Sequence, residues 1–393
     1  MNTEDTIIPL KGPDRVRRRP AVIFGNHEEE WAINAIKMLL DLFFTEAALG
    51  YCKKIAVMLE EDHSVTVESF DRGLFLDETE QDGKPAWFNV FCDFACGPRE
   101  ANAEYLHYCR MKHNVLFGDK TEPSLKFMSE TDSAFDLCVF QYVCEWMKVE
   151  SVHGSVLGRL CFEKGYAVSE LEKEPASKTS YTKISFKLDR EILDDGAVTF
   201  EALSAILRGG AICNPGLNCT VYHREEKATF FYPKGCADYL KERCDSAEST
   251  PVFFSEILAN GKDRYNRENY DASVRAAVVF VAGGGGAECF HNFRSLPDGG
   301  KHLNAAKKKI VRALQRRFDE FEFLNEKFIF DRMLLVLVTN CSERMTRWSN
   351  REGTALGNRM IAEMSSDVFG GDFDHYLKMN AEKLLSLLSE KQI

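Results

Sequence analysis

Three cysteines and a histidine have a spacing that could hold a metal ion. Cys92, Cys96, Cys109 and His113 follow the pattern C-x3-C-x12-C-x3-H. Thiolate sulfur and imidazole nitrogen are the ligands that hold Zn²⁺ in structural sites. Buried thiols among aromatic side chains explain the same residues, and we favour this interpretation because the chain contains 13 cysteines. A zinc site on these four residues is the alternative hypothesis.

A basic segment at 307–317 could contact phosphate groups. In a helix over 301–318, Lys308, Arg312 and Arg316 have i, i+4 spacing and share one face. The apolar face is marked by Ile310, Val311, Leu314 and Phe318. The basic face would suit the phosphate backbone of DNA, and a solvated surface of an acidic protein explains it equally well. We expect at most a weak DNA contact through this segment.

Four consecutive glycines at 283–286 could cradle a phosphate. No Gly-Lys-Ser/Thr sequence follows them, however, and an apolar strand pattern lies on either side. The run therefore predicts a hairpin turn.

Composition excludes several classes of protein. The chain has 393 residues and a net charge of −11, which argues against a surface that coats nucleic acid everywhere. Its longest aliphatic run, at 333–338, is far shorter than the roughly 20 apolar residues that span a bilayer. The first residues show no secretory signal, and the odd number of cysteines favours reduced thiols. We expect a soluble, cytoplasmic protein without membrane contact.

Apolar patterning predicts the elements that position these residues. A helix is expected over 32–49, followed by a hairpin of strands at 55–59 and 64–67. The elements expected next are a strand at 183–186, a helix at 200–207, a break at 214–216 and a helix at 237–244.

A polar stretch at 245–251 is the expected domain boundary. The elements expected after it are a strand at 273–282, the basic helix at 301–318, a strand at 328–339 and a final helix at 373–389. Strands and helices alternate in both halves. The pattern therefore predicts an α+β chain of two domains, 1–245 and 246–393.

The order of short motifs along the chain resembles a known family. The motifs are LKGPDRVRRRP (10–20), TEAALGYC (45–52), DRG (71–73), ICNPG (212–216), FYPKG (231–235), DGGKHL (298–303) and ALGN (355–358). In this order they resemble the N-terminal ATPase and transducer region of DNA gyrase B and of its counterpart in topoisomerase IV, which are type IIA topoisomerases. The resemblance covers nearly the whole chain.

This resemblance implies a specific fold and specific partners. Residues 1–245 would form a GHKL (Bergerat-type) α/β sandwich domain with an insertion at about 79–103. Residues 246–393 would form a transducer domain of the ribosomal protein S5 domain 2-like kind. The family uses ATP and Mg²⁺, forms dimers and works with a partner topoisomerase subunit.

Two helical positions depart from the family's catalytic pattern. Hydrolysis of ATP requires a carboxylate base and oxygen ligands for a cation. The family's glutamate base falls on Met38, and its asparagine ligand for Mg²⁺ falls on Leu42. A thioether cannot take a proton from water, and leucine offers a hard cation no oxygen. We therefore expect neither hydrolysis nor bound ATP and Mg²⁺.

Other nucleotide contacts also depart from the family. The adenine-reading aspartate falls on Ser69, the transducer lysine on Gly353, and the glycine-rich lid on 129–136, which contains no glycine and three carboxylates. Arg72, Gly73 and Thr182 match the family and would form a remnant nucleotide pocket.

An ion pair is implied beneath this pocket. The resemblance pairs Glu46 with Arg72, and we interpret the pair as structural. We expect Met38, Leu42 and Phe43 or Phe44 to line the pocket above it and to fill part of the nucleotide volume.

These observations favour a diverged, hydrolysis-deficient homologue that acts in DNA topology through a partner. One alternative is a working, ATP-binding fragment of a topoisomerase subunit. A second alternative is a zinc-containing protein-interaction module that reuses the fold.

Overall fold

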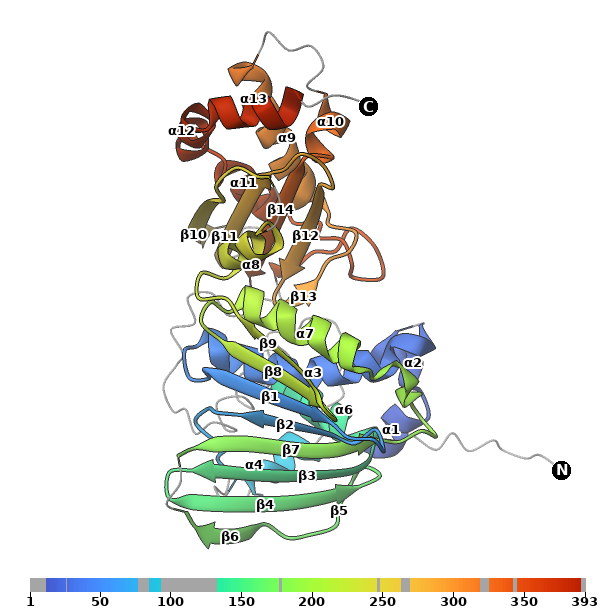
Figure 1. Cartoon of the computed structure of the whole chain (residues 1–393). Helices are drawn as coiled ribbons and strands as arrows, with labels where there is room; N and C mark the ends of the chain where they lie inside the picture. The colour runs from blue at the N-terminus through green and yellow to red at the C-terminus, as the bar shows by residue number, and fades with distance from the viewer. Residues whose placement is uncertain are drawn as a thin grey trace, which may run out of the picture. The chain divides into compact units, whose positions relative to one another are not determined.

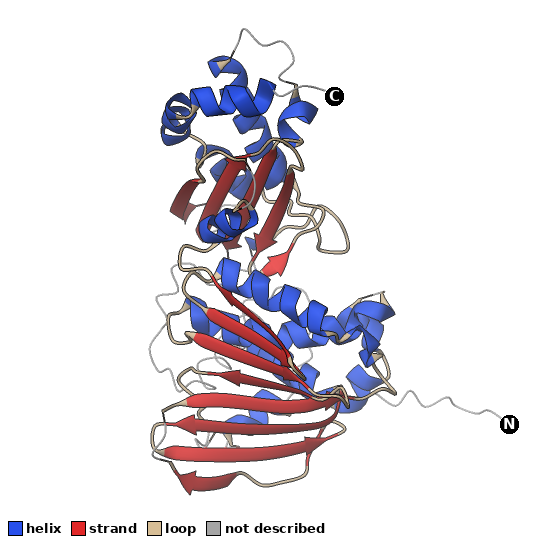
Figure 2. Ribbon diagram, in the orientation of Figure 1, coloured by secondary structure: helices blue, strands red, loops and turns tan. Residues whose placement is uncertain are grey.

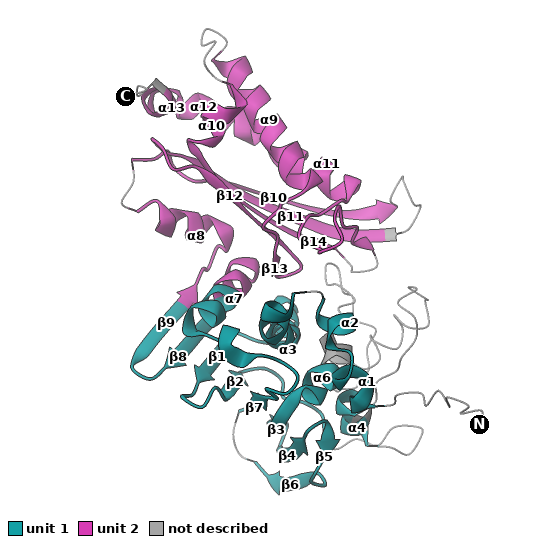
Figure 3. Cartoon of the chain, turned by 90° about the vertical axis from the view of Figure 1, so that its right-hand side faces the viewer, with its two compact units in different colours: residues 1–123, 131–207, 219–229 teal, residues 124–130, 208–218, 230–393 magenta. Residues whose placement is uncertain are grey.

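The computed structural model describes residues 12–25, 27–76, 85–92, 133–176, 179–245, 248–262, 269–318, 325–341 and 345–389. The chain divides into two compact units (Figure 3). The first comprises 1–123, 131–207 and 219–229, and the second comprises 124–130, 208–218 and 230–393. Residues 230–245 thus cluster with the second unit, although the polar stretch that suggested a boundary follows them.

A large twisted sheet forms the centre of the first unit (Figure 1). Among the described residues it has nine strands in the order β5-β4-β3-β7-β2-β1-β8-β9, with β6 paired to β4. The strands are β1 (Lys54–Leu59), β2 (Val65–Ser69), β3 (Cys144–His153), β4 (Val156–Glu163), β5 (Tyr166–Ala167), β6 (Glu172–Pro175), β7 (Tyr181–Leu188), β8 (Asn218–His223) and β9 (Glu226–Phe231).

Helices cover one face of this sheet (Figure 2). They are α1 (Pro13–Arg17), α2 (Pro20–Phe24), α3 (Trp31–Ala48), α4 (Ala86–Phe91), α6 (Ser133–Tyr142) and the first part of α7 (Phe200–Cys213), with short 3-10 turns η1 (Glu28–Glu30) and η2 (Asp195–Ala197). The covered face explains the alternating burial of β1, in which Ile55, Val57 and Leu59 are buried. Helix α3 and the β1–β2 hairpin confirm the elements expected at 32–67.

The second unit contains a five-stranded sheet among its described residues. Its order is β10-β11-β14-β12-β13. The strands are β10 (Phe253–Lys262), β11 (Asn269–Phe280), β12 (Gly286–His291), β13 (Arg294–Ser295) and β14 (Met333–Cys341). Neighbouring strands of this sheet are antiparallel, except that β12 and β14 run parallel.

Helices lie on both faces of the second sheet. Helix α8 (Cys236–Arg243) packs against β11 and β14, on the face opposite α9 (Lys301–Arg317) and α11 (Arg359–Asp367) (Figure 3). The core under α9 is apolar and includes Ala276, Phe280, Leu337, Ile310, Leu314, Ile361 and Phe373. None of the helices in the described ranges combines the length and apolarity that a membrane crossing requires.

The four glycines at 283–286 do not form the expected hairpin turn. Strand β14 lies between β11 and β12, antiparallel to the first and parallel to the second. The segment therefore crosses from one strand to a non-neighbour, and the amide of Gly285 donates to the carbonyl of Asp331 at 2.8 Å. The prediction was wrong because β14 enters the sheet from about fifty residues further along the chain.

Three other predicted elements have different bounds. The helix expected at 200–207 continues to Cys213. The first residues of the strand expected at 328–339 belong to a helix, α10 (Glu326–Phe330). The side chain of Asn325 caps this helix by accepting a hydrogen bond from the amide of Phe328 at 3.0 Å. The final helix is two helices, α12 (Gly371–Met379) and α13 (Ala381–Ser389), interrupted at Asn380.

Gly300, at the start of α9, should tolerate no side chain. Its φ is +132°, and a Cβ there would lie 2.2 Å from the carbonyl oxygen of Leu356. That oxygen already accepts a hydrogen bond from the amide of Lys301 at 2.8 Å. We expect Gly300→Ala to lower the free energy of unfolding by at least about 2 kcal/mol in urea titrations.

Gly283→Ala is the matched control. A Cβ at Gly283 would meet nothing within 4 Å, so the change should stay within about 0.5 kcal/mol of wild type. Equal stability of the two variants would contradict the packing at Gly300.

Candidate functional site

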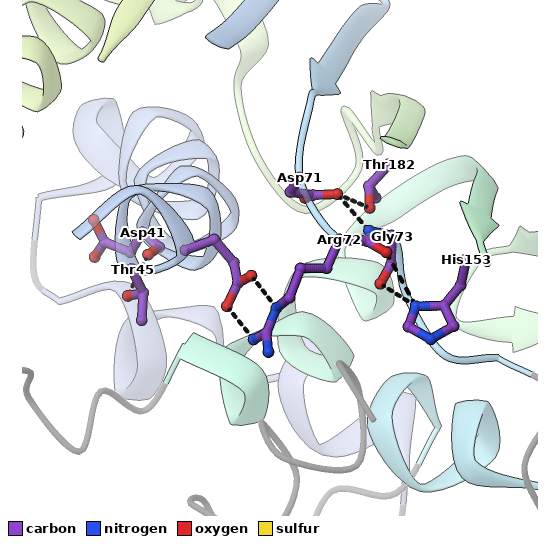
Figure 4. A network of polar contacts seen from close by, with 8 residues as sticks. Asp41, Thr45, Asp71, Arg72, Gly73, His153 and Thr182 are labelled. Atoms are coloured by element: carbon purple, nitrogen blue, oxygen red, sulfur yellow. Dashed lines mark hydrogen bonds and ion pairs between the residues drawn. The ribbon is translucent and has the colours of Figure 1, made fainter. Parts of the chain in front are cut away.

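A buried ion pair joins α3 to the loop after β2 (Figure 4). The Arg72 guanidinium donates from Nε to Glu46 Oε2 at 3.0 Å and from Nη2 to Oε1 at 2.9 Å. The side chain of Glu46 is fully buried and that of Arg72 is 20% exposed. The pair is bidentate, the geometry in which arginine and carboxylate interact most strongly. The ion pair expected from the sequence is confirmed.

Arg72 is held from its other side by an aromatic ring. Its guanidinium carbon lies 3.8 Å from the ring centroid of Tyr51. The amides of Tyr51 and Cys52 donate to the carbonyl of Glu46, which turns the chain back after α3. The sequence TEAALGYC therefore supplies both the carboxylate and the ring that orient one arginine.

The next residues form a second polar cluster around Asp71. Its Oδ1 accepts from the amide of Gly73 at 2.8 Å and from the hydroxyl of Thr182 at 3.0 Å (Figure 4). Asp71 is only 7% exposed. Burial raises the pKa of Asp71 to about 6, although the hydrogen bonds from Gly73, Ser69 and Thr182 oppose this shift. The motif DRG predicted that Arg72 and Gly73 belong to the site. It did not predict a role for Asp71, because that role depends on burial and on the hydrogen bond from Thr182.

The loop at 71–74 is fastened to the neighbouring strands. The Ser151 hydroxyl accepts from the amide of Leu74 at 2.6 Å and donates to the carbonyl of Tyr181 at 3.0 Å. His153 Nδ1 lies 3.0 Å from the carbonyl of Arg72. Gly73 has a φ of +74°, and a Cβ there would lie 1.9 Å from the carbonyl oxygen of Val152. Only glycine can occupy position 73 when the backbone lies this close to the neighbouring strand.

Two positions on α3 lack the oxygen atoms that a cation or a proton transfer requires. Met38 is half-buried and Leu42 is fully buried, four residues apart on the same face. Phe43 and Phe44 are also buried, as expected. Neither Met38 nor Leu42 can ligate Mg²⁺ or act as a base, so these residues do not fit the metal that the resemblance implies.

Ser69, the position of the family's adenine-reading aspartate, lies between Cys52 and Asp71. It is fully buried, and its hydroxyl lies 3.2 Å from the sulfur of Cys52. Burial raises the pKa of the Cys52 thiol to about 11, so the sulfur is protonated at neutral pH. The contact is therefore a neutral hydrogen bond inside the core.

The zinc hypothesis gains no support. Cys92 is half-buried and its carbonyl accepts from the hydroxyl of Tyr142. Cys96, Cys109 and His113 lie outside the described residues, as do 129–132 of the expected lid and most of the expected insertion. Within the described residues, no group of three or more His, Cys, Asp or Glu side chains could hold a metal ion.

The basic helix is present in the second unit. Lys308, Arg312 and Arg316 lie on α9, while Ile310 and Leu314 are buried beneath it. The Nη2 of Arg316 lies 3.5 Å from a carboxylate oxygen of Asp374, and both side chains are more than half exposed. The amphipathic pattern predicted from the sequence is confirmed, and the face remains a candidate anion-binding surface.

Curated relatives are similar to nearly the whole chain. The B-type subunit of the type 2 topoisomerase of Aquifex aeolicus is 24% identical over 99% of the chain, and the DNA gyrase B of Thermotoga maritima is 23% identical over 98%. These matches cover 46% and 58% of the relatives, so the chain spans about half of their length. No family model matches the chain.

Solved structures show the fold. The 43K ATPase domain of Thermus thermophilus gyrase B, in complex with an aminocoumarin, has a TM-score of 0.69 at 22% identity and covers 96% of this chain and 93% of its own. The ATP-binding domain of Francisella tularensis topoisomerase IV has a TM-score of 0.66 at 18% identity, with coverages of 96% and 95%. The chain therefore has the expected α+β fold, the fold of these gyrase B and topoisomerase IV domains, and the resemblance is confirmed.

Breaking the buried ion pair should destabilise the protein strongly. In Arg72→Met the Glu46 carboxylate would stay fully buried without its cation, which costs about 3–5 kcal/mol. Chemical denaturation at neutral pH measures the loss.

Arg224→Met is the control for this prediction. Arg224 pairs with Glu61 at 3.0 Å, but both side chains are mostly exposed, so its removal should cost less than about 1 kcal/mol. Similar losses in the two variants would show that the Glu46–Arg72 pair has no special role.

Proposed function

We propose that this chain is a hydrolysis-deficient homologue of the ATPase and transducer region of gyrase B and its topoisomerase IV counterpart, and that it acts in DNA topology through a partner protein. The proposal rests on the similarity of nearly the whole chain to these proteins. The departure from them that matters most for hydrolysis lies in one helix.

The observation that carries the proposal is the apolar face of α3. The Glu46–Arg72 pair, with Arg72 donating two hydrogen bonds, supports the alignment of this helix with the family. In that alignment Met38 and Leu42 occupy the positions of the base and of the Mg²⁺ ligand. Because neither side chain carries a suitable oxygen, hydrolysis would lack both essential groups.

The remnant pocket supports the same proposal. Arg72, Gly73 and Thr182 are the residues that the resemblance places beside a nucleotide. In this chain each of them has an internal partner: Arg72 binds Glu46, while Gly73 and Thr182 donate to Asp71. A pocket whose polar groups serve the protein itself favours a structural role over ATP turnover.

A partner is proposed because the relatives that the chain resembles are named as subunits. Those relatives are named as B-type subunits and gyrase B proteins, and the chain spans about half of their length. We propose a topoisomerase subunit or another protein as the partner, with a homodimer as a further arrangement. The rival proposal, a working ATP-dependent fragment, requires a base and a cation ligand other than Met38 and Leu42, because neither of these side chains carries an oxygen.

The purified chain should release no phosphate from ATP above background. Loss of the base alone should reduce the rate by about 10²- to 10⁴-fold. A phosphate-release assay with Mg²⁺ measures this, and Thr182→Ala serves as the control for a contaminating ATPase. Steady phosphate release by the wild type that disappears in Thr182→Ala would contradict the proposal. Calorimetric titration with a non-hydrolysable ATP analogue then separates binding from turnover.

The basic face of α9 should bind DNA weakly through phosphates. Contacts by Lys308, Arg312 and Arg316 predict a log–log salt slope near −2.7, from about −0.9 per neutralised phosphate. We expect micromolar or weaker affinity at low salt, because the net charge of −11 opposes binding. Mobility shifts should be abolished when all three residues are changed to Glu.

The matched control changes Lys227, Lys234 and Lys241 to Glu. These residues are exposed and lie outside α9, and the change in net charge is the same. Equal loss of binding in the two triple variants, or no binding by the wild type, would refute the DNA contact and leave a protein partner alone.

A further inference from the structure

One edge of the sheet in the second unit is long and open. Among the described strands, β10 ends the strand order and pairs only with β11, in an unbroken antiparallel register from Phe253 to Lys262 (Figure 1). Its ten residues make it the longest of the edge strands that the structure describes. An edge of this kind presents backbone donors and acceptors to which another strand can pair.

The devices that usually protect an edge strand are missing from β10. The strand contains no proline, and its register with β11 shows no bulge. The short strand β6, at an edge of the first sheet, instead consists of three charged residues and Pro175. Such charges and prolines discourage pairing between edges. Strand β10 is therefore open to pairing in a way that β6 is not.

Side chains of β10 alternate between the core and solvent. Ile257 and Ala259 pack on the core of the second unit, whereas Leu258 is 57% exposed. Glu256 and Lys262 are also exposed, and both share the outward face with Leu258, because residues at even spacing lie on the same side of a strand. The outward face therefore carries an apolar side chain between an acid and a base.

Symmetry restricts how two copies of this strand can pair. In an antiparallel dimer the two-fold axis is perpendicular to the sheet, so side chains that lie opposite each other belong to the same face. With the axis at Ala259, Glu256 of each copy lies opposite Lys262 of the other. These are the only charged side chains of β10, so Ala259 is the one centre that pairs opposite charges within the strand.

Strand β11 adds a second cation to this arrangement. Arg275 is paired in register with Glu256, and its Nε lies 3.7 Å from Glu256 Oε1. Its Nη2 also donates to the carbonyl of Cys213 at 2.6 Å, which holds the guanidinium in place. In the dimer each Glu256 carboxylate would lie between Arg275 of its own chain and Lys262 of the second copy. Such a network contributes more than an isolated surface ion pair.

We propose that β10 is a homodimerisation edge, at which two copies of the chain pair their β10 strands antiparallel about Ala259 and join their sheets into one. Leu258 of each copy then lies diagonally opposite Leu258 of the other, within contact distance. A single pair of strands is a small interface, so the dissociation constant should be micromolar. The inference goes beyond the proposed function and needs neither nucleotide nor DNA.

The first test measures self-association of the full chain by sedimentation equilibrium. Lys262→Glu places two acids opposite each other at both ends of the interface, so it should weaken the dimer at least about tenfold. Adding Glu256→Lys to Lys262→Glu restores opposite charges, and it should tighten the dimer again by at least about threefold. Leu258→Lys should also weaken the dimer, because it places a charge in the apolar centre.

Two matched controls change exposed residues elsewhere. Lys227→Glu on β9 alters the net charge as Lys262→Glu does, and Met379→Lys on α12 replaces a side chain that is 69% exposed. Neither residue lies on β10, so both variants should associate like the wild type.

The second test determines the register by crosslinking. Residues directly opposite each other have Cα atoms about 4.5–5.5 Å apart, which a disulfide can bridge. Ala259→Cys should therefore link two copies when diamide takes two electrons and two protons from the thiol pair. Leu258→Cys should not, because the diagonal distance of about 7–8 Å exceeds the reach of a disulfide. Non-reducing electrophoresis measures the product, with the wild type as the control for native cysteines.

Three results would overturn the inference. A wild type that stays monomeric well above micromolar concentrations would leave this edge to another partner. Equal association of Lys262→Glu, Lys227→Glu and the wild type would place any dimer contact elsewhere, and crosslinking by Leu258→Cys as efficient as by Ala259→Cys would contradict the register. If Ala259→Cys does not fold, the exposed charge variants decide alone. Phosphate release from ATP enters none of these outcomes, so failure here and failure of the proposed function are distinguishable.

Discussion

The arrangement of the first unit depends on the burial of one carboxylate. Glu46 is fully enclosed, and a buried charge is tolerated only with a partner of opposite sign. Arg72 must therefore reach α3, which brings the loop at 71–74 against the sheet. There Gly73 approaches the carbonyl of Val152 so closely that no side chain fits. One electrostatic constraint thus determines the path of the segment that contributes Asp71, Arg72 and Gly73 to the site.

The same constraint explains how the fold can persist without side-chain oxygens at positions 38 and 42 of α3. This helix is held by its buried apolar residues and by the Glu46–Arg72 pair, and neither needs an oxygen at Met38 or Leu42. Apolar side chains at these positions add to the buried surface, which stabilises the helix. The architecture and the chemistry of the site are therefore separable, and the polar atoms of Asp71, Gly73 and Thr182 are directed to one another.

The second unit shows a similar separation between its core and its surface. Helix α9 packs its apolar face on the sheet and α11, whereas its basic residues lie outside that core. Burial holds the helix in place whatever the basic face contacts. A role in binding phosphates is thus compatible with the stability of the unit, because it uses side chains that the core does not need.

Local patterns in the sequence determined the elements whose signals are local. Helix α3, the β1–β2 hairpin and the amphipathic α9 follow from apolar periodicity and turn residues, and the motif order predicted the Glu46–Arg72 pair through resemblance. Tertiary structure alone decided the insertion of β14 between β11 and β12, and the engagement of Thr182 by Asp71. The physical reason is range: periodicity is set by neighbours along the chain, whereas strand order and the partner of a buried carboxylate depend on residues about fifty to a hundred positions away.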